Sequence, residues 1–251
     1  MTYGHPNKSG GHSPVDIAFV LATDEPLFLV GGQAVNLWGL YYRDWVSEMA
    51  PMVSQDVDVL GGRETLSKIA ELAGNSPQFF SMRPPTNEVG VVMARKMDGG
   101  QFAIEVLNHV HGISNEELCQ PAYTITVQGS QVKVRVPSPV ALLQAKIANV
   151  SDLPQSDRQD KLHILILAAI LPAYFADIQS SVIAEPINEL DMLNLLERLL
   201  NIVADPKGKS VLETIGIRPH SIFYKLNIDA GALPRIDGFF TKRLPRILPG
   251  S

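Results

Sequence analysis

The stretch Gln55-Asp56-Val57-Asp58-Val59-Leu60 decides the fold of the first half of this 251-residue chain. Its apolar residues are typical of a buried β-strand, and residues two apart in a strand share a face, so Asp56 and Asp58 point the same way, about 7 Å apart. Two like charges beside a core are costly unless a cation or hydrogen-bond donors meet them. A divalent metal ion would satisfy both carboxylates at once.

Strands and helices alternate around this stretch. Residues 27–30 predict a strand that ends at Gly31-Gly32, and the apolar residues of 33–42 recur at helical spacing. Residues 63–73 predict an amphipathic helix that covers one face of a sheet. Further strands are predicted at 89–96, 101–107, 123–127 and 131–136, the first two joined by the turn sequence Asp98-Gly99-Gly100.

The second half of the chain predicts helices. Ser138 can cap a helix with Pro139 at its first position, and the pattern continues to Val150. Residues 162–175 are strongly apolar but interrupted by Pro172, and 189–203 show helical spacing. These apolar runs indicate packed helices rather than membrane spans, because Pro172 and nearby charges break them. We therefore expect a mixed α+β fold, with residues 1–137 forming an α/β domain and residues 138–251 a helical domain.

Composition narrows the functional class. With 45% hydrophobic and 19% charged residues and no signal-like N-terminus, the sequence predicts a globular, cytoplasmic protein. The single cysteine, Cys119, argues against a disulfide framework or a structural zinc site. Residues 1–205 carry 13 Lys+Arg against 23 Asp+Glu, whereas residues 206–251 carry 8 against 3. This basic tail could contact RNA, or it could dock on the acidic body of the protein.

A third carboxylate and a glycine turn add to the aspartate pair. Glu105 lies within Phe102-Ala103-Ile104-Glu105-Val106-Leu107, another apolar strand, and Gly31-Gly32 would let phosphate oxygens approach the N–H groups at the start of a helix. Each feature alone has an ordinary explanation: a tight turn, an exposed strand face or a solvent-facing glutamate. Together, three carboxylates on one sheet face could hold two divalent cations for phosphoryl transfer.

The combined motifs resemble the nucleotidyltransferase superfamily related to DNA polymerase β. The matching segments are Phe28-Leu29-Val30-Gly31-Gly32-Gln33-Ala34-Val35-Asn36-Leu37-Trp38, Ser54-Gln55-Asp56-Val57-Asp58-Val59-Leu60 and Ile104-Glu105-Val106-Leu107. Within the superfamily, the chain is most similar to bacterial minimal and abortive-infection-type nucleotidyltransferases, some of which serve as toxins. The resemblance covers about residues 25–170 and implies a nucleotidyltransferase-like mixed β-sheet flanked by helices.

The resemblance also implies roles for particular residues. Asp56 and Asp58 would bind Mg²⁺, with Glu105 completing the metal site or helping to deprotonate the acceptor hydroxyl. Gly31, Gly32 and Gln33 would form the nucleotide-binding turn. Leu142-Leu143-Gln144-Ala145-Lys146 resembles a family helix whose lysine faces the phosphates, although Lys146 could instead reach solvent. Arg158-Gln159-Asp160-Lys161 resembles a further family segment of the form Arg-x-Lys-Asp, but Asp160 and Lys161 stand in the reverse order in this chain. The resemblance makes Arg158 a candidate nucleotide contact.

The resulting hypothesis is a nucleotidyltransferase that uses two Mg²⁺ ions to move a nucleoside monophosphate from an NTP, such as ATP, to an acceptor hydroxyl and releases pyrophosphate. The acceptor would be RNA, protein or a small molecule, with RNA such as tRNA weakly favoured by the basic tail. A toxin–antitoxin context with an antitoxin partner is a corollary of the resemblance. The alternatives are a catalytically silent nucleotide-binding or interaction module of the same fold and a phosphodiester hydrolase, which would leave the glycine turn unexplained.

Overall fold

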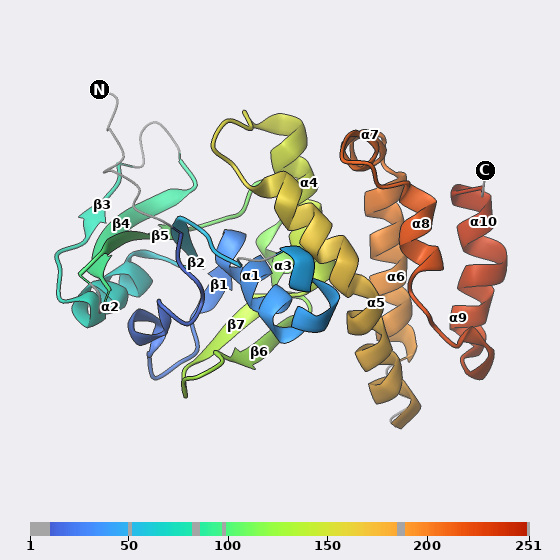
Figure 1. The fold of residues 1–251 in the computed structure, drawn as a ribbon, viewed down its shortest axis with the longest axis horizontal. Coiled ribbons are helices and arrows are strands. Elements are labelled where there is room, and N and C mark those ends of the chain that lie inside the picture. Colours follow the sequence, from blue (N-terminus) through green and yellow to red (C-terminus); the bar gives the residue numbers. More distant parts are fainter. Residues whose placement is uncertain (1–10, 50–51, 82–85, 97–98, 185–188, 250–251) are drawn as a thin grey trace. The chain divides into compact units, whose positions relative to one another are not determined.

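The computed structural model describes residues 11–49, 52–81, 86–96, 99–184 and 189–249 (Figure 1). The chain divides into two compact units, Met1–Tyr41 with Glu48–Leu142 and Tyr42–Ser47 with Leu143–Ser251. The first unit is built on a seven-stranded mixed sheet, and the second is helical. The predicted α+β class, with a mixed sheet flanked by helices and a C-terminal helical region, is confirmed.

The sheet has the strand order β3-β4-β5-β2-β1-β7-β6. Its strands are β1 Phe28–Val30, β2 Asp56–Leu60, β3 Gln78–Phe79, β4 Glu88–Arg95, β5 Gln101–Leu107, β6 Ala122–Thr126 and β7 Lys133–Pro137. The β1–β7 and β2–β5 pairs are parallel, and the other neighbouring strands are antiparallel. Strands β5, β2 and β1 therefore lie in the middle of the sheet, where neighbours on both sides fix their register.

The two longer helices of the first unit, α1 Gly31–Tyr41 and α2 Arg63–Ala73, follow the predicted periodicities. The unit also has the 3-10 turn η1 Ala18–Leu21 and the short α3 Asn115–Cys119; a further 3-10 turn, η3 Ser47–Met49, lies before β2. On α2 the buried residues are Leu66, Ile69 and Ala70, as the amphipathic pattern predicts. The predicted 98–100 turn is described only from Gly99, whose φ is +87°; Asp98 lies outside the described residues.

The second unit is built from helices joined by loops. The helices are α4 Pro139–Asp152, whose first turn belongs to the first unit, α5 Asp160–Ala184, α6 Glu189–Ala204, α7 Pro206–Thr214, α8 Pro219–Tyr224, α9 Pro234–Gly238 and α10 Leu244–Ile247, with the 3-10 turns η2 Arg43–Trp45 and η5 Ala230–Ala232 and the π-helical segment η6 Phe239–Arg243. The predicted cap of α4 is confirmed, because the Ala141 N–H donates to Ser138 Oγ at 3.1 Å. Helices α5 and α6 pack side by side (Figure 1).

The predicted interruption at Pro172 is wrong, because α5 continues through this residue. A proline inside a helix removes one backbone hydrogen bond and costs about 3 kcal/mol. Ile170, Leu171 and Phe175 around it are fully buried, and burial of each such side chain contributes about 1.5–3 kcal/mol, so packing outweighs the loss. Among the described residues, α5 is the one helix long and apolar enough for a membrane span, yet most of that stretch is buried inside the protein.

Candidate functional site

The three predicted carboxylates lie on one face of the central strands. In the parallel pair β2–β5, Asp58 is the register partner of Glu105, and Asp56 precedes Asp58 by two residues. All three side chains are half-buried. The opposite face of the same strands carries the buried residues Val57, Val59, Phe102, Ile104 and Val106. The expected common face is therefore present, with the apolar side of the strands anchored in the core.

Gly31 joins this carboxylate face to a helix without an intervening loop. Strand β1 ends at Val30, the register partner of Asp58, and α1 begins with the next residue. Gly31 has a φ of +65°, and a Cβ built on it would stand 1.8 Å from Asp58 Oδ2. The Asp58 carboxylate thus occupies the space that any other side chain at position 31 would fill. The first N–H groups of α1 have no carbonyl partner inside the helix, which makes this end suited to an anion.

The donor chemistry of the carboxylate face fits a hard divalent cation. Carboxylate oxygens are the ligands that Mg²⁺ prefers, and paired positions on adjacent strands stand about 4.8 Å apart. In the described part of the chain, however, no group of three or more His, Cys, Asp or Glu side chains is placed so as to hold a metal ion. The backbone brings Asp56, Asp58 and Glu105 to one face, and rotation of their side chains would have to complete a metal site.

Two amide side chains of α1 are buried behind the glycine turn. Gln33 is 0% exposed, and its Nε2 donates to the His12 carbonyl at 2.9 Å. Asn36, one helical turn further along, is 1% exposed. Gln33 Oε1 and Asn36 Nδ2 have no hydrogen-bond partner among the residues that the structure describes. Gln33 therefore lies within the predicted turn, but its donor group is already bound to the N-terminal segment.

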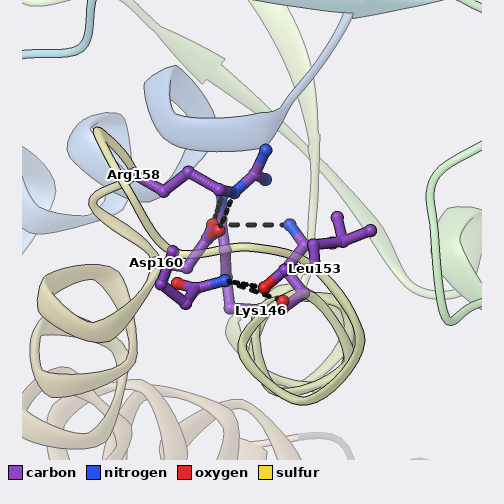
Figure 2. A network of polar contacts seen from close by, with 6 residues as sticks. Lys146, Leu153, Arg158 and Asp160 are labelled. Carbon is purple, nitrogen blue, oxygen red and sulfur yellow. Dashed lines mark hydrogen bonds and ion pairs between the residues drawn. The ribbon is translucent and has the colours of Figure 1, made fainter.

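The two cationic candidates, Lys146 and Arg158, meet at one buried carboxylate of the second unit. Lys146 Nζ lies 2.8 Å from Asp160 Oδ1, and Arg158 Nε lies 2.6 Å from Asp160 Oδ2 (Figure 2). The side chains of Lys146 and Asp160 are 7% and 3% exposed, whereas that of Arg158 is 39% exposed. The alternative that Lys146 reaches solvent is wrong, because its ammonium group is buried against Asp160.

The electrostatics of this cluster keep Asp160 ionised. Burial alone would raise the pKa of its carboxyl group, but the charges and hydrogen bonds of Lys146 and Arg158 outweigh burial and hold that pKa below its usual range. His163, on the next turn of α5, is 4% exposed, and neither ring nitrogen has a hydrogen-bond partner within the described chain. Burial, reinforced by the charge of Lys146, lowers the pKa of His163 to about 3.

Sequence reasoning missed two groups that the structure brings into contact with candidate residues. The carbonyl of His12 receives the Gln33 amide, and His163 lies buried beside the Lys146–Asp160 pair. The first contact has no local signal, because residues 12 and 33 are 21 positions apart. His163 lies one helical turn from Asp160, but the Lys146–Asp160 pair beside it joins residues 14 positions apart. Spacing along the chain reports neighbours on one element, whereas these contacts depend on how elements pack.

Comparison with known proteins returns one distant structural match. No family model matches the chain, and no curated protein matches it. A crystal structure of an antigenic nucleotidyltransferase-like protein from Paracoccidioides brasiliensis is similar with a TM-score of 0.39 and 15% sequence identity, over 86% of this chain and 100% of that chain. A likeness of this degree carries no inference about activity, so the function rests on the site itself.

Proposed function

We propose that this protein is a metal-dependent nucleotidyltransferase that moves a nucleoside monophosphate from an NTP to an acceptor hydroxyl and releases pyrophosphate. The observation that carries the proposal is the junction of three elements. Asp58 pairs in register with Glu105 on one side and with Val30 on the other, and its carboxylate lies over the α-carbon of Gly31 at the start of α1. The helix end that would face phosphate and the carboxylate face thus meet at Asp58.

Each residue of this junction has a role that follows from its chemistry. Asp56, Asp58 and Glu105 would bind Mg²⁺, which when present would neutralise phosphate charge and favour in-line attack by the acceptor hydroxyl. The backbone N–H groups at Gly31 and Gly32 would bind phosphate oxygens, because the α1 N-terminus carries a partial positive charge. Lys146 and Arg158 remain expected nucleotide contacts from the resemblance, and the proposal does not depend on them.

The resemblance to abortive-infection-type enzymes supports a cytoplasmic toxin with an antitoxin partner, and ATP is the first NTP to test. The positively charged residues 206–251 favour RNA over a protein or a small molecule as acceptor, since Lys and Arg gain from counterion release at phosphates.

Label transfer tests the proposal. The wild-type protein is incubated with each labelled NTP and Mg²⁺, together with total tRNA, small-molecule acceptors or the protein alone. We expect label on one acceptor class for wild type and none for Asp58→Ala, whose circular dichroism spectrum should match that of wild type. Undiminished transfer by a folded Asp58→Ala protein would refute the assignment of the site.

A silent nucleotide-binding module is the second candidate. It is favoured by the finding that no three carboxylate, His or Cys groups of the described residues are placed to hold a metal ion. The same incubation separates the two functions, because a module would bind labelled NTP without passing the label to any acceptor. Saturable binding with no transfer across the whole acceptor panel would establish the module.

A further inference from the structure

An N-terminal segment crosses the elements that form the proposed site. His12 and Ser54 form an isolated antiparallel bridge, in which the His12 N–H donates to the Ser54 carbonyl at 2.7 Å and the Ser54 N–H donates to the His12 carbonyl at 3.0 Å. Ser54 stands two residues before Asp56, at the entry to β2. The bridge therefore ties His12 to the residues that lead directly into the strand carrying both aspartates.

Gln33 connects the same bridge to the glycine turn. Its Nε2 donates to the His12 carbonyl at 2.9 Å, so one carbonyl accepts from the segment before β2 and from the first turn of α1. The Gln33 side chain is 0% exposed, which leaves this amide little freedom to turn toward a ligand. A neutral hydrogen bond in a buried site is also stronger than one in water.

Packing around the segment fixes its position. The His12 ring is 2% exposed and lies 5.0 Å from the Phe102 ring of β5, the strand that carries Glu105. A Cβ added to Gly11 would stand 2.8 Å from Val53 Cβ, so the backbone at Gly11 lies directly against the chain before β2. Segment 11–13 thus contacts β5, α1 and the residues directly before β2, so it touches or adjoins the three elements of the proposed site.

We propose that Gln33 is a positioning residue. Through the His12 carbonyl, it fixes the position of the first turn of α1 relative to the residues that lead into β2. This inference rests on the proposed function, since that relative position matters for transfer only if phosphates bind at Gly31-Gly32 and metal ions at Asp56 and Asp58. The role differs from direct nucleotide contact, in which the Gln33 amide would face the ligand. A shift of about 1 Å in such a geometry can reduce turnover about 100-fold.

Gln33→Met tests the role, because it keeps the length of the side chain and removes the donor. Gln179→Met is the matched control: Gln179 is 7% exposed and hydrogen-bonds the backbone of Asp229 through both amide atoms, but it belongs to the second unit. Amide hydrogen exchange at Ser54 reports the bridge, and kcat and KM for the NTP report the site. These two readouts are independent of each other.

We expect Gln33→Met to speed exchange of the Ser54 amide roughly three- to tenfold and to lower kcat while KM stays near the wild-type value, with no change at Ser54 in Gln179→Met. Unchanged exchange at Ser54, or faster exchange with undiminished kcat, would overturn the positioning role. A raised KM with unchanged exchange would instead identify a direct nucleotide contact. If wild type transfers no label, the proposed function fails, while exchange at Ser54 still decides whether Gln33 holds the bridge.

Discussion

Replacing Gly31 with alanine should lower both the stability of the fold and the transfer activity of the site, and the two losses can be measured separately. Gly31 has a φ of +65°, a conformation in which an L-residue is strained by about 1–2 kcal/mol. The new Cβ would also stand 1.8 Å from Asp58 Oδ2 and 2.9 Å from Asp58 Cβ. Rotating the carboxylate relieves the first contact but not the second, because Asp58 Cβ is fixed by its backbone.

The size of the combined effect can be worked from these contacts. Ordinary van der Waals contact begins near 3.4 Å, so the carboxylate oxygen must move by about 1.6 Å. Insertion of a methyl group into a packed site costs about 1–3 kcal/mol, which adds to the backbone strain. We expect Gly31→Ala to lower the free energy of unfolding by about 2–5 kcal/mol. Displacement of Asp58 should also reduce label transfer at least about 100-fold.

Gly74 provides the matched control. It has the same φ of +65° at the end of α2, and a Cβ there would meet nothing within 4 Å. Gly74→Ala should therefore lose only the strain, about 1–2 kcal/mol, and keep its transfer activity. Urea unfolding followed by circular dichroism, without added metal ions, measures both variants. In an Asp58→Ala background, the loss caused by Gly31→Ala should fall toward that of Gly74→Ala. Equal losses for the two glycine variants in the wild-type background would refute the reasoning.

The remaining predictions concern the buried ions of the second unit. Asp160→Asn should lower the free energy of unfolding by about 3–5 kcal/mol, because it leaves the Lys146 ammonium group buried without its counter-ion. The control Asp152→Asn breaks the Lys207 pair, which has the same 2.8 Å separation but 62% and 30% exposed side chains, and should lower the free energy of unfolding far less than Asp160→Asn; similar losses in urea melts would contradict the burial argument. His163 has its pKa lowered to about 3, so the unfolded chain binds the extra proton first and stability should fall as pH drops from about 6.5 toward 3, by up to about 1.4 kcal/mol per pH unit. His163→Leu should flatten that fall in melts recorded across this range, and an unchanged slope would show that another group is responsible.

Sequence periodicity predicted the helices and strands whose apolar residues mark one face for burial. The bounds of α2 and β5 agree with the predicted ranges, because an amphipathic stripe and a strict alternation each define one buried face. The short helices after residue 205 were not predicted, and three of them begin at Pro206, Pro219 and Pro234. Each proline stands at a position where the missing N–H is harmless.

In the candidate site, too, some features follow from a local sequence pattern and others depend on how distant segments pack. The common face of Asp56 and Asp58 follows from strand alternation and was predictable, whereas the place of Glu105 beside them depends on the parallel register of β2 and β5. The contact between Gly31 and Asp58 depends on the antiparallel register of β1 and β2, which no local pattern contains. The Lys146–Asp160 pair depends on where the first residue of α5 lies against α4. Long-range geometry of this kind is determined by packing, so it appears only once the elements are assembled.

In strand β2, the residues that stabilise the fold also fix the orientation of the residues of the proposed site. Val57 and Val59 are 0% exposed and alternate with Asp56 and Asp58, so a slip of one residue would bury both carboxylates and expose both valines. Burial of two valines contributes about 3–6 kcal/mol, and burial of unpaired carboxylates adds a further penalty. The core therefore fixes which way the aspartates face, whether or not a metal ion is bound. A polar substitution at Val57 or Val59 would loosen that constraint, and the loss would appear at the carboxylate face although neither valine belongs to it.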